Sequence, residues 1–163
     1  MTQTFEITAQ GHPRLSRMRG IFAEQYRFSR DLVDRAAMAF GKPWADEAEE
    51  TLQVLFSDDE ALALAVKGYS AFALDSMRRQ ARFEKDLAYP AKTYEEAARE
   101  VYFNDDHMMG VYLPGLLLSH FLWPHHYRQL EFFDTAFVAP MRAAGGDRFV
   151  EVGVGTGLYS RRL

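Results

Sequence analysis

Apolar residues recur at helical spacing along most of this chain. Between about Pro13 and Gly41 they return mostly every three, four or seven positions, with Arg, Asp and Glu between them, at Leu15, Met18, Phe22, Tyr26, Val33, Ala37 and Phe40. This pattern predicts one amphipathic helix. Gly41 and Pro43 are expected to end it, because glycine favours helix C-termini and proline cannot continue a helix.

The same spacing predicts further helices in the middle of the chain. A short helix is expected from about Ala45 to Phe56, and a long one from Glu60 to about Leu87, with Asp58 and Asp59 as its candidate N-cap. Thr93-Tyr94-Glu95-Glu96 has the form of a capping box, in which a Thr hydroxyl and a Glu carboxylate bond each other's backbone amides. It predicts the start of another helix.

The segment from Tyr102 to Tyr127 is the most aromatic and histidine-rich part of the sequence. Pro114 and Pro124 each disfavour a helical conformation of the residue before them, so two or three short, broken helices are predicted here. Pro124 suits the first position of the next helix. Gly145 and Gly146 are expected to end that helix.

One segment alone has the features of a strand. Arg148 to Val152 is short, β-branched and bounded by glycine, and a helical turn is expected to follow at Leu158. The predicted fold is mainly α, with a helical domain at residues 1–144 and the beginning of an α/β unit at residues 145–163.

Composition and charge narrow the classes of function. The 163 residues are 48% hydrophobic and 14% aromatic, which suits one globular unit of ordinary size. Lys and Arg number 19 against 23 Asp and Glu, for a net charge of -4. This balance gives no basic field to attract a phosphate backbone, so nucleic acid is not an expected partner.

The chain lacks the features of secreted and membrane proteins. It contains no cysteine, which excludes disulfides and thiolate metal sites. The N-terminus has no signal-peptide pattern, and no apolar run approaches the roughly 20 residues that span a bilayer. No membrane association and a cytoplasmic location are expected.

The most informative motif is Glu151-Val152-Gly153-Val154-Gly155-Thr156-Gly157. Glycines directly after a strand let the backbone turn tightly and approach a ligand where a side chain would collide. A dinucleotide-binding turn would follow the pattern Gly-x-Gly-x-x-Gly, with Gly or Ala at position 158, where this chain has Leu. A dehydrogenase-like turn and a turn without ligand remain alternatives.

This motif closely resembles the first motif of class I S-adenosylmethionine-dependent methyltransferases, which lies at the end of the first strand of a Rossmann-like domain. In that family the glycine turn passes under the methionine part of the cofactor, and the acidic residue helps to hold the cofactor's amino group. The resemblance implies S-adenosylmethionine as the cofactor. It also implies cofactor-binding roles for Glu151, Gly153, Gly155 and Gly157.

The helical region before the motif is also similar to this family. Many methyltransferases of small molecules, including natural-product enzymes, place helices ahead of the core, where they cap the acceptor pocket and often mediate dimerisation. The resemblance implies a small-molecule methyl acceptor and a homodimer formed through the helical region. Because the family's other cofactor and catalytic residues lie downstream of this motif, the chain is expected to be the N-terminal piece of a longer enzyme and inactive alone.

Four histidines in the aromatic segment are candidates for acid–base chemistry: His107, His120, His125 and His126. Histidine is the usual general base near neutral pH, and His120 is the first candidate if the helix continues and places it beside Trp123 and Tyr127. Most of these residues are expected to be packed core side chains. A shared metal is not expected, because adjacent His125 and His126 point to different sides of a helix.

A competing hypothesis assigns no catalysis to the chain. The helices would form an interaction or dimerisation module, and the terminal glycines would only make a turn. The two hypotheses differ in whether the glycine turn binds a ligand.

Overall fold

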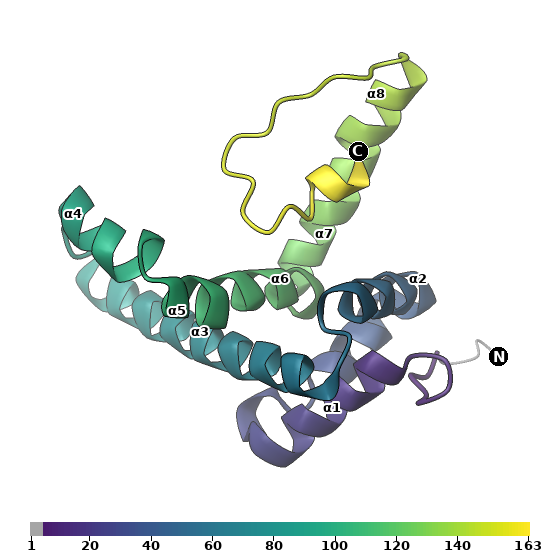
Figure 1. Cartoon of the computed structure of the whole chain (residues 1–163), viewed down its shortest axis with the longest axis horizontal. Coiled ribbons are helices and arrows are strands. Elements are labelled where there is room, and N and C mark those ends of the chain that lie inside the picture. Colours follow the sequence, from purple (N-terminus) through teal and green to yellow (C-terminus); the bar gives the residue numbers. More distant parts are fainter. Residues whose placement is uncertain (1–4) are drawn as a thin grey trace.

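A computed structural model describes residues 5–163, and all regular structure in that range is helical. Four helices form the body: α1 (Pro13–Gln25), α2 (Leu32–Leu55), α3 (Asp59–Asp86) and α6 (Leu113–Leu122), with α6 lying along α3 (Figure 1). Their apolar faces meet in one core, whose largest members include Leu15, Met18, Phe22, Trp44, Leu52, Leu62, Tyr69, Leu118 and Phe121. The mainly α prediction is confirmed.

Shorter elements connect and extend this body. The segments η1 (Arg27–Ser29), α4 (Tyr94–Ala97), η2 (Ala98–Tyr102), α5 (Asp105–His107) and η3 (Met108–Tyr112) lie between the larger helices. Helix α7 (Pro124–Phe133), η4 (Asp134–Val138) and α8 (Ala139–Ala143) form a rod that projects from the body, and the chain then loops out and returns to η5 (Ser160–Arg162) (Figure 1). Within residues 5–163 no helix has the length and apolar character of a membrane span.

The single long helix predicted for residues 13–41 is wrong. It is divided at Tyr26, which has φ -130° and ψ 77°, and α2 starts afresh at Leu32. The break lets α1 and α2 pack against each other. Periodicity could not reveal it, because the apolar stripe resumes on the second helix seven positions after Tyr26.

Several predicted helix boundaries are confirmed, two of them by side-chain caps. The Asp58 carboxylate accepts a 2.7 Å hydrogen bond from the backbone amide of Ala61. At the capping box, the Thr93 amide donates to Glu96 at 2.9 Å, and the Glu96 amide donates to the Thr93 hydroxyl at 3.2 Å. Pro124 begins α7, and Gly145, with φ 71°, follows the end of α8.

The break predicted at Pro114 is wrong. Leu113, before the proline, is helical with φ -66° and ψ -46°, and the helix continues to Leu122. The preceding turn, Met108–Tyr112, is a π-helix, and a second π-helical turn precedes Pro140 in the same way. A wider turn relieves the clash of a proline ring with the carbonyl of the turn before it.

Gly41 interrupts α2 as the sequence suggests. Its φ of 68° and ψ of -153° lie outside the helical region, and the helix resumes before Pro43, which sits in its first turn. The expected short helix from about Ala45 to Phe56 is therefore the second half of α2, ending at Leu55.

The strand predicted at Arg148–Val152 is not formed. Residues 147–151 have no regular structure, although residues 149–152 are rich in apolar side chains. A strand is defined by its ladder to a neighbour, and the part of the chain that the structure describes offers no second strand. Val150 and Val152 are consequently 92% and 94% exposed.

Helix α3 and the helix η3–α6 approach so closely that two positions admit only glycine. A Cβ on Gly68 would lie 2.2 Å from the backbone oxygen of Gly110, and one on Gly115 would lie 2.4 Å from Phe72 Cβ. Both distances are far below van der Waals contact. The two glycines thus set the spacing between these helices.

Replacing Gly68 by Ala is expected to lower the free energy of unfolding by about 1–3 kcal/mol, because the contacted atom is backbone and the helices must separate. Gly20→Ala in α1 is the matched control, since its Cβ would meet nothing within 4 Å. There the higher helix propensity of Ala should raise stability by about 0.5–1 kcal/mol. Urea denaturation measures both, and equal effects of the two substitutions would contradict this account of the helix contact.

The N-terminus of α1 is capped by a side chain from α2. His12 precedes α1 but gives no side-chain cap. Instead the buried Glu49 carboxylate accepts hydrogen bonds from the amides of Arg14 at 3.0 Å and Leu15 at 2.8 Å. A carboxylate at this position satisfies orphan amides and interacts favourably with the helix dipole.

Glu49→Ala should lower the free energy of unfolding by about 1–3 kcal/mol, because it leaves buried amides without an acceptor. Its neighbour provides a matched control: Glu50 is exposed and pairs with Arg161 at 2.7 Å. Glu50→Ala should cost at most about 1 kcal/mol. If chemical denaturation found the two variants equally stable, Glu49 would not be the cap of α1.

Candidate functional site

The glycine motif forms an open turn on the surface of α6. Gly153, Gly155 and Gly157 have φ values of 73°, 55° and 73°, in the left-handed region that favours glycine. The Gly157 amide donates to the Val154 carbonyl at 2.9 Å. A Cβ on Gly153 or Gly157 would meet no atom within 4 Å, and one on Gly155 would lie 3.4 Å from Leu116 Cδ2 of α6.

Glu151, the acidic residue of the motif, lies at the edge of a small apolar cavity. The cavity has a volume of about 300 Å³ and is bounded by the loop Phe149–Val152, Phe133 and Phe137 of the projecting rod, and Tyr159. Small-molecule sites range from about 300 to 1,000 Å³, so this one is at the lower end. The Glu151 carboxylate accepts a hydrogen bond from the Ser160 hydroxyl, which ties the two ends of the glycine segment together.

His120 of α6 lies beside the glycine segment, and its hydrogen bond shows which ring nitrogen carries the proton. Its Nδ1 is 2.7 Å from the carbonyl oxygen of Leu116, so Nδ1 carries the proton and Nε2 of the neutral ring has the free lone pair. Burial lowers the pKa of His120 from its ordinary value of 6.5. Its ring packs edge-on against Tyr159, with 5.6 Å between centroids.

A second histidine extends this cluster. His126 Nδ1 is 2.9 Å from the hydroxyl of Ser119, and its ring is 5.3 Å from that of His120. Burial lowers the pKa of His126 to about 4, helped by the neighbouring His125 and His120. Aromatic rings therefore follow one another from Trp123 through His126, His120 and Tyr159 to Phe133 at the wall of the cavity.

The structure brings together some of the candidates from the sequence and separates others. His120 and the glycine turn are neighbours through Leu116 and Tyr159. The helix does not continue from His120 to Tyr127, because it breaks at Trp123, whose ψ is 117°, so the condition for placing these three side chains on one helical face is not met. Among residues 5–163 no cluster of three or more His, Asp or Glu side chains is arranged to hold a metal ion.

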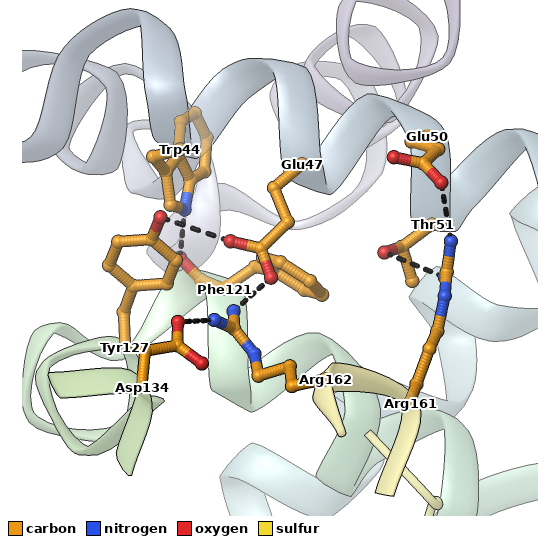
Figure 2. A network of polar contacts seen from close by, with 9 residues as sticks. All are labelled: Trp44, Glu47, Glu50, Thr51, Phe121, Tyr127, Asp134, Arg161 and Arg162. Atoms are coloured by element: carbon orange, nitrogen blue, oxygen red, sulfur yellow. Dashed lines mark hydrogen bonds and ion pairs between the residues drawn. The ribbon is translucent and has the colours of Figure 1, made fainter. Parts of the chain in front are cut away.

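Arginines at the end of the chain dock the glycine segment onto the helical body (Figure 2). The guanidinium of Arg162 pairs with Glu47 of α2 and with Asp134 of η4. Glu47 also accepts a 3.2 Å hydrogen bond from the hydroxyl of Tyr127, and burial together with Glu47 raises the pKa of Tyr127. These contacts join α2, α7 and η5.

Arg161 adds a second attachment to α2. It pairs with Glu50 at 2.7 Å and donates to the Thr51 hydroxyl at 3.4 Å (Figure 2). Leu158, just before η5, is 5% exposed and belongs to the main core. The docking of Arg161 and Arg162 onto α2 was not predicted from the sequence. The only signal in the sequence is that these two arginines are adjacent, and adjacent arginines occur in many structural contexts.

No family model, curated protein or solved structure matches this chain. The evidence for function therefore comes from the motif and from the geometry around it.

The depressed pKa of His126 makes stability depend on pH in a defined window. His126 binds a proton near pH 6.5 in the unfolded chain and near pH 4 in the folded chain. Its contribution to the free energy of unfolding is therefore fully present above pH 6.5 and decreases as the pH falls toward 4. His126→Gln should reduce this slope, since it removes the titrating group but keeps a polar side chain. Urea denaturation across the window measures it for both proteins. Identical slopes would show that His126 titrates normally.

Proposed function

We propose that this chain forms the N-terminal part of an S-adenosylmethionine-dependent methyltransferase that acts on a small-molecule acceptor. One observation carries the proposal: the motif Glu151 to Gly157, whose three glycines all adopt positive φ and of which Gly153 and Gly155 are exposed. A turn of that kind admits a ligand close to the main chain, where Cβ atoms would obstruct it.

The surroundings of the turn fit a cofactor with a charged amino acid end and a sulfonium. Gly153 and Gly157 leave open space where a Cβ would project, and the Glu151 carboxylate can accept from an ammonium group if it releases Ser160. The cavity beside Glu151 is walled by Phe133, Phe137 and Tyr159. Aromatic faces attract a sulfonium through cation–π interaction. When bound, the cofactor would supply the methyl group.

His120 is the residue proposed to accept the acceptor's proton. It is neutral at pH 7 because its pKa is lowered, and its Nδ1–H bond to Leu116 leaves Nε2 as the basic atom. A general base must be unprotonated and fixed in orientation to act near neutral pH. The helical body would exclude water and align the acceptor, on which the rate of a displacement depends strongly.

A second candidate is the helical interaction or dimerisation module. It is favoured by the exposure of apolar side chains in the loop, above all Val150 and Val152. In this case the glycines would serve only the geometry of the turn. Binding of S-adenosylmethionine distinguishes the two candidates.

The test is Gly153→Val in the full-length protein. Gly153 has φ 73° and nothing within 4 Å of its Cβ, so valine there projects into the open space beside the turn and should abolish detectable cofactor binding in calorimetric titration. Gly145→Val is the matched control, because Gly145 also has positive φ, at 71°, but lies outside the motif and has nothing within 4 Å of its Cβ. Both variants carry a backbone penalty of about 1–3 kcal/mol.

Only the substitution in the motif should remove binding. Equal affinity of the Gly153→Val variant and the unmodified protein would overturn the proposed role of the turn. Absence of any affinity for S-adenosylmethionine in the folded, unmodified protein would overturn the methyltransferase proposal and favour the interaction module.

A further inference from the structure

A second cavity lies where α2, α3 and the junction of α6 with α7 meet. Its volume is about 560 Å³, and it shares no lining residue with the cavity beside Glu151. Its walls are mainly apolar, with Leu32, Met77, Leu122 and Trp123 among them, and its polar side chains include Arg35 and His125. The volume is ample for a small organic molecule.

Trp123 is a lining residue of this cavity that is held rigidly by its neighbours. Its indole N–H donates to the Tyr69 hydroxyl at 2.8 Å. Phe72 stacks on the ring, with 5.8 Å between centroids and 27° between planes, and His125 stacks at 5.8 Å and 25°. A side chain fixed in this way loses little freedom when a ligand packs against it.

Arg35 is the charged group of the cavity, and its charge has no partner among residues 5–163. The two acidic side chains near it at the start of α2 are already paired, because Asp31 binds Arg30 at 3.4 Å and Asp34 binds Arg19 at 3.3 Å. No carboxylate lines the cavity. Arg35 is an exposed residue at the lining of this mainly apolar cavity, and no carboxylate of the cavity neutralises its charge.

From these features we infer that the cavity is a binding site for an organic anion with a flat apolar body, such as an aromatic carboxylate. The guanidinium can hold a carboxylate through two parallel hydrogen bonds. The ring system would then pack on Trp123, Leu122 and Met77. This inference concerns a site separate from the glycine turn and does not depend on the proposed methyl transfer.

The two tryptophans of the chain allow a direct test by NMR. Their indole N–H groups give two separate signals: Trp123 lines the cavity, whereas Trp44 is fully buried in the core and bonded to the Phe121 carbonyl at 2.9 Å. Titration with 2-naphthoate should move the Trp123 signal and leave the Trp44 signal in place. The uncharged 2-naphthylmethanol should bind about tenfold more weakly or worse, because it lacks the charge that Arg35 recognises.

Two charge-removing variants complete the test. Arg35→Gln should weaken 2-naphthoate binding about tenfold and bring its affinity to that of the alcohol. Arg27→Gln is the matched control, since Arg27 is exposed, lies outside the cavity and should leave binding unchanged. The inference is overturned if about 1 mM naphthoate leaves the Trp123 signal unmoved, if acid and alcohol bind equally, or if both variants have the same effect.

Discussion

The close contact between α3 and the helix η3–α6 is the constraint on which the rest of the structure depends. Gly68 and Gly115 let the two backbones approach to a distance that a methyl group would forbid. That approach fixes α6, and α6 presents Leu116 to the glycine turn and His120 to Tyr159. The same contact lets Trp123 reach the hydroxyl of Tyr69. The cavity beside Trp123 thus takes part of its wall, Met77 of α3 and Leu122 of α6, from this pair of helices.

Helix α2 connects the remaining parts through its carboxylates. Glu49 turns inward and caps α1, while Glu47 and Glu50 turn toward the arginines of η5. The glycine segment is therefore fixed at its end and exposed in its middle: Leu158 is buried in the core, whereas Val152, Gly153 and Gly155 are exposed. A loop with anchored ends and an accessible backbone is suited to ligand binding, because it loses little conformational entropy when the ligand binds.

Local signals in the sequence identified much of the helical framework and the turn. Asp58, the capping box at Thr93 and Pro124 each act within a few residues of themselves, so their effects could be foreseen. Glycine at 153, 155 and 157 likewise indicated a tight turn, and all three have positive φ. The strand before the turn failed as a prediction because its formation depends on a partner strand elsewhere, which no local pattern supplies.

By itself, the sequence determined that the chain is mainly helical, where most helices begin, and that its last residues hold a glycine-rich turn after an acidic residue. Only the tertiary structure decided that Tyr26 divides the first helix, that Arg162 joins Glu47 to Asp134, and that Arg35 lines a cavity that contains no acidic side chain. The physical reason is the distance along the sequence over which each effect acts. Caps, prolines and glycines act through neighbouring backbone groups. Ion pairs and cavities join residues that are distant in the sequence, as Arg162 and Glu47 are at a separation of 115 positions, and their meeting depends on how whole helices pack.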